Sequence, residues 1–278
     1  MAARPAAGYV DFMTARLIDQ QAPATFGDLL RAWRHRRHLS QLELANDVEV
    51  STRHLSFIET GRARPSREMV LHLAEHLDVP LRDRNQLLLS AGFAPVYPES
   101  SLHSPQMMAV RETLRRLLAA HEPFPALVVD RWWHLVEANA SLLELVGDAA
   151  EHLLAPPVNV LRLSLHPEGM APRIVNLGEW RGHLLSRLRR QVALTADPEL
   201  ADLLDELTSY PCDQPDVEPH GGGEVVVPLR MRIDDTELAV LSTVATFGTP
   251  LDVTVAELVI ESFFPADEAT AAWLRDRR

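Results

Sequence analysis

The sequence predicts two domains of different class: a compact all-α module of five helices, followed by an α+β domain built on an antiparallel sheet. Between Thr25 and Phe93, helix-start signals recur at short intervals and no strand pattern appears. A Pro- and Ser-rich stretch, 94–105, then separates this helical region from a region with both strand and helix patterns. Beyond it come two short apolar runs, several helical patterns and three further strand candidates, in that order. A length of 278 residues suits about two domains.

Composition and charge set the protein's class. Apolar residues make up 46% and charged residues 24% of the chain, as in an ordinary globular protein. The net charge of −12 arises entirely beyond residue 100, where 15 arginines face 27 acidic residues, and this asymmetry indicates that the two halves do different jobs. No apolar run approaches the ~20 residues that cross a bilayer, and no signal peptide is evident. Cys212, the only cysteine, forms no intrachain disulfide. We expect a cytoplasmic protein without a membrane segment, metal site or cofactor.

Capping residues mark where the five N-terminal helices are predicted to begin, and Gly92 marks where the last one ends. Residues 1–24 are predicted to be a tail, with a short helix near 10–18, and residues 25–93 to be the helical domain. Ser40 has Glu43 three residues later, which is the pattern of a capping box. The predicted helix starts are Thr25, Ser40, Ser51, Ser66 and about Leu81, and the last helix stops at Gly92.

The second domain, 106–278, mixes strands and helices. Strands are predicted at 126–129, 132–138, 224–233, 237–247 and 251–264, and helices at 106–121, 139–146, 178–194, 198–209 and 265–275; residues 210–223 form a loop. In the last strand, Leu258 and Ile260 alternate with Glu257 and Glu261. The simplest packing is a five-stranded antiparallel sheet with helices over one face. PAS-like sensor domains have this order of elements, although many α+β folds share it.

Residues 41–61 carry the pattern of a helix-turn-helix. Two helices that cross steeply need a small residue at the crossing, and Ala45 supplies it. Glu49 stands in the turn, where Gly often takes a left-handed conformation. The apolar residues at buried positions are Leu44, Val48, Val50, Leu55 and Ile58. The alternative is an ordinary two-helix hairpin of a helical bundle.

The first turn of the second helix is polar and free to face outward. Ser51 caps this helix, and recognition helices use the N-terminal turn on base edges. We expect Thr52 and Arg53 to read bases, since Arg pairs with guanine through O6 and N7. The predicted DNA-contacting residues are Gln41, Ser51, Thr52, Arg53, His54, Phe57, Arg62 and Arg64.

This module resembles the Cro/phage-repressor class, the XRE family. The stretch 61–66, Gly-Arg-Ala-Arg-Pro-Ser, matches that family's loop into the fourth helix. The resemblance implies that Gln41 contacts phosphate and that Arg34 pairs with Glu59. We expect the protein to bind double-stranded DNA as a homodimer.

Several runs in the second domain, together with 52–70 and 81–95, resemble the MmyB-like transcription regulators over about residues 25–275. These runs are WHLVEAN (133–139), NVLRLSLH (159–166), NLGEW (176–180), STVATFGTPLD (242–252) and FFPAD (263–267). The resemblance implies a PAS-like domain that holds a fatty-acid-like small molecule.

Such a ligand needs an apolar cavity and an anchor for its head group. We expect aromatic side chains to line the cavity and an Arg or His to take a carboxylate. The predicted ligand-binding residues are Trp132, Trp133, Arg162, His166, Arg173, Trp180 and Phe247. The alternative is that the aromatic residues form ordinary core and that the arginines are solvated or pair with this domain's many acids.

Other sequence features indicate no enzyme. No nucleophile-elbow, metalloprotease or phosphate-loop motif occurs, so no catalytic residues are predicted. His72 and His76 share a helix face, but no third ligand accompanies them. Two other functions stay open for the second domain: protein contacts and dimerisation without sensing, or an unrecognised enzymatic activity.

Overall fold

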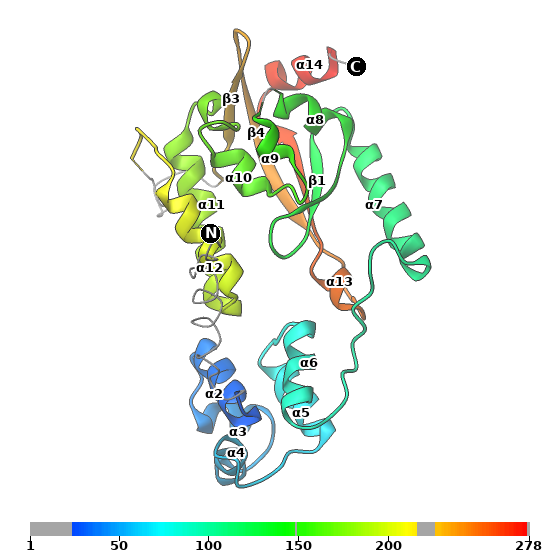
Figure 1. The fold of residues 1–278 in the computed structure, drawn as a ribbon, viewed down its shortest axis with the longest axis vertical. Coiled ribbons are helices and arrows are strands. Elements are labelled where there is room, and N and C mark those ends of the chain that lie inside the picture. The colour runs from blue at the N-terminus through cyan, green and yellow to red at the C-terminus, as the bar shows by residue number, and fades with distance from the viewer. Residues whose placement is uncertain (1–23, 148, 216–225, 277–278) are drawn as a thin grey trace, which may run out of the picture. The chain divides into compact units, whose positions relative to one another are not determined.

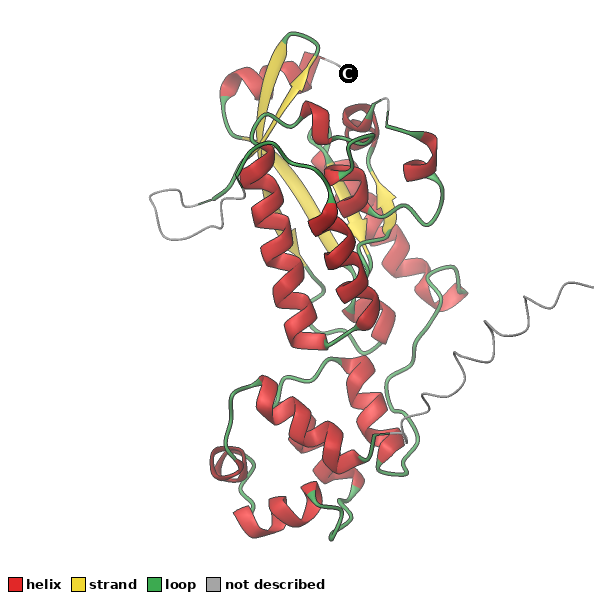
Figure 2. Cartoon of the chain, turned by 60° about the vertical axis from the view of Figure 1, so that its left-hand side comes forward, coloured by secondary structure: helices red, strands yellow, loops and turns green. Residues whose placement is uncertain are grey.

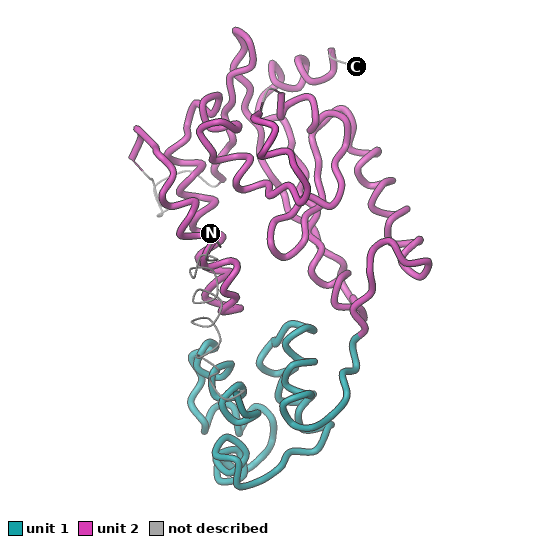
Figure 3. The backbone as a smooth tube through the Cα atoms, viewed as in Figure 1, with its two compact units in different colours: residues 1–97 teal, residues 98–278 magenta. Residues whose placement is uncertain are grey.

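The computed structural model describes residues 24–147, 149–215 and 226–276 (Figure 1). The chain divides into two compact units at the bond between Tyr97 and Pro98 (Figure 3). The predicted tail up to residue 23, the predicted loop from 216 to 223 and the start of the predicted strand 224–233 lie outside the described residues. None of the described helices is long and apolar enough to span a membrane.

The N-terminal unit contains the five predicted helices. They are α2 (Phe26–Arg36), α3 (Gln41–Asp47), α4 (Thr52–Glu59), α5 (Arg67–His76) and α6 (Leu81–Ser90). Capping boxes form at Thr25 and at Ser40. In each, the hydroxyl accepts a hydrogen bond from the backbone N–H three residues later, and the acidic side chain of that later residue accepts one from the backbone N–H of the capping residue. Local sequence therefore determines where these helices begin.

Helices α2 and α4 approach each other closely at Gly27. A Cβ atom at this position would lie 2.3 Å from the carbonyl oxygen of Glu59. Because such a contact is far inside van der Waals distance, only glycine allows the two helices to pack here. Gly27 therefore allows α4, the second helix of the helix-turn-helix, to pack against α2.

The predicted linker 94–105 is divided between the two units. The Asn85 side chain accepts a hydrogen bond from the Tyr97 backbone N–H at 3.1 Å and donates to its carbonyl oxygen at 2.7 Å. One residue later, the Pro98 carbonyl accepts from the Val253 backbone N–H at 2.8 Å. The division between the two compact units, after Tyr97, thus falls within the predicted linker.

The C-terminal unit is built on a five-stranded sheet. Its strands are β1 (Ala126–Val129), β2 (Leu135–Ala138), β3 (Leu229–Ile233), β4 (Thr236–Ala245) and β5 (Val259–Pro265). All neighbours pair antiparallel in the order β2-β1-β5-β4-β3. The predicted α+β class and PAS-like antiparallel sheet are confirmed.

The helices of this unit are α7 (Met108–His121), α8 (Ala140–Val146), α9 (Glu151–Leu154), α10 (Val160–Leu165), α11 (Leu177–Thr195), α12 (Pro198–Ser209), α13 (Val253–Ala256) and α14 (Glu268–Asp276), with short 3-10 turns at Pro105–Met107 and Ala171–Arg173. As predicted, Asn139 caps α8 by accepting the Leu142 backbone N–H at 3.2 Å. Helices α11 and α12 lie side by side (Figure 2).

Two details of the predicted sheet are wrong. Both faces are covered, because Leu114 and Leu118 of α7 pack against β1 and β5 on the face opposite the other helices. The predicted strand 251–264 begins with helix α13, which Asp252 caps. The alternation holds within β5, but Glu261 is only 4% exposed because its face is covered as well.

Candidate DNA-binding and ligand-binding sites

The helix-turn-helix forms as the sequence predicts. Ala45 is fully buried between α3 and α4, and its carbonyl oxygen accepts the Val50 backbone N–H at 2.9 Å. Glu49 has a φ of +54°, the left-handed conformation that favours glycine. The turn therefore has the expected geometry, and Glu49 holds it at a cost in backbone strain.

The first turn of α4 presents polar side chains to solvent. The Ser51 hydroxyl caps the helix by accepting the His54 backbone N–H at 3.2 Å. Arg53 and His54 are exposed, and Thr52 is half-buried. These side chains have the freedom that contact with base edges in a DNA groove requires.

Two of the predicted DNA-contacting arginines lie close to the ring of Phe57. The guanidinium of Arg53 lies 5.3 Å from the centroid of the Phe57 ring, and that of Arg62 lies 5.9 Å from it. Stacking on the ring orients both cations without neutralising them. Arg64 is exposed in the loop that follows.

Gln41 and Arg34 meet at the buried Glu59 carboxylate. Arg34 donates from Nε and Nη2 at 2.7 and 3.0 Å, and the Gln41 amide donates at 2.7 Å. Burial alone would raise the pKa of Glu59, but these hydrogen bonds and the Arg34 charge outweigh it, so the pKa lies below its ordinary value. The expected Arg34–Glu59 pair is thus present. Gln41 hydrogen-bonds to Glu59, and its contact with a DNA phosphate stays a prediction.

The C-terminal unit contains a partly open apolar cavity of about 350 Å³. It lies between the sheet and helices α8, α10 and α11, and nearly all of the described residues that line it are apolar. Leu143 of α8 and Leu154 of α9 line it while being 61% and 39% exposed, which places them at its rim. Such a volume falls at the lower end of the ~300–1,000 Å³ of small-molecule sites.

The polar groups of the cavity are few and each has a protein partner. Trp180 donates from Nε1 to the Ser164 hydroxyl at 3.0 Å, and Trp133 donates from Nε1 to Gln191 at 2.8 Å. Glu261 accepts from Arg187 at 2.9 Å. Trp133 also has a φ of +66°, a conformation that a bulky residue rarely adopts. Its strained backbone holds the indole in the cavity wall.

Two of the seven predicted ligand-binding residues, Trp133 and Trp180, line this cavity. The other five do not line it. Trp132 lies in a shallow depression with Arg162, and Phe247 packs on the opposite face of the sheet, beside α7.

The predicted anchors are engaged in other contacts. Arg162 forms a two-point ion pair with Glu206, its Nε 2.8 Å from Oε1 and its Nη2 2.7 Å from Oε2. Arg173 donates to the Val146 carbonyl oxygen. Both arginines therefore have protein acceptors, and the Arg162 pair with Glu206 is the pairing with an acid that the composition of this domain leaves open.

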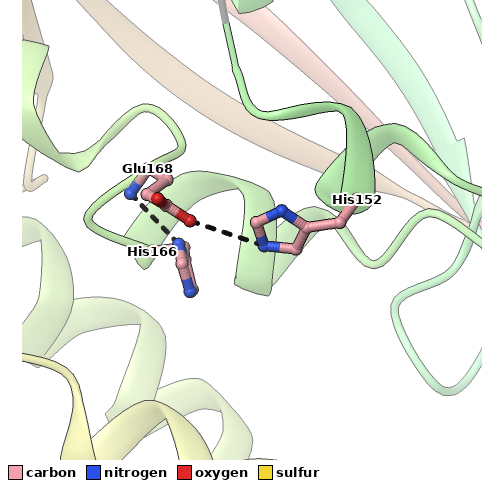
Figure 4. A group of neighbouring side chains, drawn as sticks. All are labelled: His152, His166 and Glu168. Atoms are coloured by element: carbon pink, nitrogen blue, oxygen red, sulfur yellow. Dashed lines mark hydrogen bonds and ion pairs between the residues drawn. The ribbon is translucent and has the colours of Figure 1, made fainter.

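His166 belongs to a surface cluster with His152 and Glu168 (Figure 4). Their ligand atoms lie within 4.8 Å of one another, as a metal site would require. However, the His166 Nδ1 accepts the Glu168 backbone N–H at 3.0 Å, and His152 lies 3.8 Å from the Glu168 carboxylate. These contacts account for the grouping without an ion, and we assign no metal to it.

Sequence reasoning missed Glu261 and the rim leucines as cavity residues. Glu261 alternates with apolar neighbours, which is typical of a solvated face. The signal that it is buried lies in Phe263, two residues later on the same strand face, which is also a cavity residue.

Comparison with known proteins agrees with both units. The family model described as the MmyB-like transcription regulator ligand binding domain matches residues 110–276, and a helix-turn-helix domain model matches residues 25–87. No curated protein matches the chain. Among solved structures, an RNA-binding light-oxygen-voltage receptor is 18% identical, with a TM-score of 0.27; the match covers 96% of this chain but 63% of that one, less than two thirds of its length. That likeness carries no argument about function. The ligand-binding-domain model spans more than half of the sequence, and the chain therefore belongs to the MmyB-like transcription regulators.

Proposed function

We propose that the protein is a sequence-specific transcription regulator whose C-terminal unit senses a small, fatty-acid-like molecule. The observation that carries this proposal is the presence, in one chain, of a helix-turn-helix with an exposed polar first turn in α4 and of an apolar cavity. The function needs no catalysis, and a regulator of this kind acts in the cytoplasm, where its DNA lies.

Double-stranded DNA is the proposed partner of the N-terminal unit. The first turn of α4 enters the major groove, Arg53 reads a base edge, and Ser51 with Gln41 contacts phosphate. Arg62 and Arg64 supply further positive charge beside this helix. Two copies of the chain bind adjacent half-sites as a homodimer, which light scattering on the free and DNA-bound protein tests directly.

The proposed ligand has an apolar chain that fills the cavity and a small polar head. Regulation requires that the ligand favour one state of the protein over the other, because equal affinity for both would shift nothing. An amphipathic ligand of this kind buries its chain against the lining residues and gains the hydrophobic free energy of their contact.

Three measurements test the proposal together. Selection of bound sequences from a random DNA pool should return one motif. Lipid extraction of the purified protein with mass spectrometry should return an acyl compound, and adding that compound should change the affinity for the selected DNA. Recovery of no ligand, with no thermal shift for fatty acids, fatty alcohols or fatty amides of any chain length, would leave dimerisation or protein contacts as the role of the C-terminal unit.

A further inference from the structure

The single charged side chain among the described residues that line the cavity is the carboxylate of Glu261. It projects from β5, where it lies opposite Leu127 of β1 and shares its strand face with Phe263. A carboxylate in apolar surroundings is costly unless it is paired. One of its oxygens accepts from Arg187, and its second accepts no hydrogen bond from the described residues. The one charged residue that lines the cavity, among those described, therefore carries one unused hydrogen-bond acceptor.

Arg187 is fixed beside this acceptor. Its guanidinium lies 2.9 Å from the Glu261 carboxylate and 4.8 Å from the centroid of the Trp133 ring. The Arg187 and Glu261 side chains are 17% and 6% exposed. The pair is neutral as a whole, so a charged head group at Glu261 leaves one uncompensated charge in a medium of low dielectric constant. A carboxylate is also repelled by Glu261, whereas an ammonium is attracted to Glu261 but leaves two buried cations to share one anion.

We propose that Glu261 and Arg187 select ligands with a neutral, hydrogen-bond-donating head group, such as a long-chain alcohol or primary amide, over the matching acid or amine. This inference rests on the proposed function, because it assigns the head-group chemistry of the same cavity. A hydroxyl or amide donates to the free oxygen of Glu261 without adding charge. An unmatched charge at a buried pair costs more than a neutral donor does.

The test is a head-group series on one chain length. Binding of tetradecan-1-ol, tetradecanamide, tetradecanoate and tetradecylamine to the full-length protein is measured at pH 8 by displacement of an apolar fluorescent probe, below the micelle concentration. We expect the alcohol and amide to bind at least about tenfold more tightly than both charged ligands, the discrimination that one mismatched buried polar group gives.

Glu261→Gln separates selection from a purely structural role. Gln retains an acceptor for Arg187 but leaves that cation uncompensated, so tetradecanoate should gain at least about tenfold relative to the alcohol. Glu237→Gln is the matched control: Glu237 is also paired with an arginine, Arg230, but lies outside the cavity, and its variant should keep the wild-type order.

The outcomes distinguish this inference from the function on which it rests. If all four ligands bind wild-type protein equally, or tetradecanoate binds best, the head-group inference is overturned and the proposed function stands. If none binds, both are overturned. The wild-type series decides the question even if Glu261→Gln does not fold; if that variant folds and keeps the wild-type order, the inference is also overturned.

Discussion

Arg34 and Glu59 form a two-point ion pair between α2 and α4, with Nε to Oε1 at 2.7 Å and Nη2 to Oε2 at 3.0 Å. The Arg34 side chain is 7% exposed and that of Glu59 is fully buried. This pair ties the recognition helix to the first helix of the unit.

Removal of one partner should lower the unfolding free energy of the N-terminal unit by more than the whole ion pair contributes to it. Glu59→Ala leaves the Arg34 cation buried without its acceptor, which costs about 3–5 kcal/mol of unfolding free energy. Adding Arg34→Ala to this variant should therefore cost less than Arg34→Ala costs alone. Chemical denaturation of the four proteins of the double-mutant cycle measures the coupling, and a coupling near zero would contradict the argument.

Arg53→Ala should relax the choice of base at one position of the selected DNA motif. Arg53 lies in the exposed first turn of α4, and loss of a base-reading Arg costs about 1–3 kcal/mol of binding free energy. Selection from a random DNA pool checks the motif, and titration checks the affinity.

Arg64→Ala is the control for Arg53, because we expect the exposed Arg64 to contact phosphate, and such a contact carries no sequence information. It should weaken all sequences alike and lower the slope of affinity against salt by about one. An unchanged motif for Arg53→Ala would remove Arg53 from base reading.

Glu49→Gly should stabilise the N-terminal unit without altering the selected motif. The left-handed conformation costs a non-glycine residue about 1–2 kcal/mol, so glycine relieves this strain. The greater unfolded-state entropy of glycine offsets about 0.5–1 kcal/mol of that stabilisation. A rise in unfolding free energy of about 0.5–1 kcal/mol is expected by thermal denaturation. The same change at Asp47, the last residue of α3, should be destabilising, and a loss of stability for Glu49→Gly would contradict the strain argument.

Leu143→Glu should weaken ligand binding while leaving the fold intact. Leu143 lines the cavity but is 61% exposed, so a carboxylate there remains hydrated in the free protein and loses water when a chain enters. We expect about a tenfold loss of affinity for an apolar probe. Leu194→Glu, which is 45% exposed near the end of α11 and outside the cavity, is the matched control and should bind as wild type does.

The C-terminal unit should lose stability as the pH falls below about 6.5. Burial lowers the pKa of the His183 imidazole from its ordinary value of 6.5, and Arg187 and Arg190 lower it further. The unfolded chain therefore binds the proton more readily, so stability is full above the unfolded pKa and declines as pH falls toward the folded pKa. Denaturation midpoints between pH 8 and pH 5 measure this decline. His183→Gln should flatten it, whereas His103→Gln, at an exposed position, should leave it unchanged.

The two units differ in how much of them the sequence could predict. The N-terminal helices begin at Ser and Thr caps whose partners lie three residues away, so a short window of sequence contains the whole signal. Helices α9, α10 and α13 have four to six residues each, too few to show a helical period, and the sequence missed them.

The candidate sites follow the same division. The exposed turn of α4 could be predicted because Ser51 to His54 are consecutive residues. The cavity brings Trp133 together with Met231 and Phe263, which only the sheet makes neighbours. Of the predicted anchors, Arg162 pairs with Glu206, and no property of the Arg162 segment alone indicates this partner.

The sequence by itself determined the two-domain organisation, the helix-turn-helix, the number and order of the strands, and the family, because capping, periodicity and motif spacing act over short stretches of chain. Only the tertiary structure decided that Glu261 faces an apolar cavity and that Arg187, 74 residues away, compensates it. A strand pattern shows which residues share a face, but whether that face meets water or other side chains depends on how distant helices pack against it.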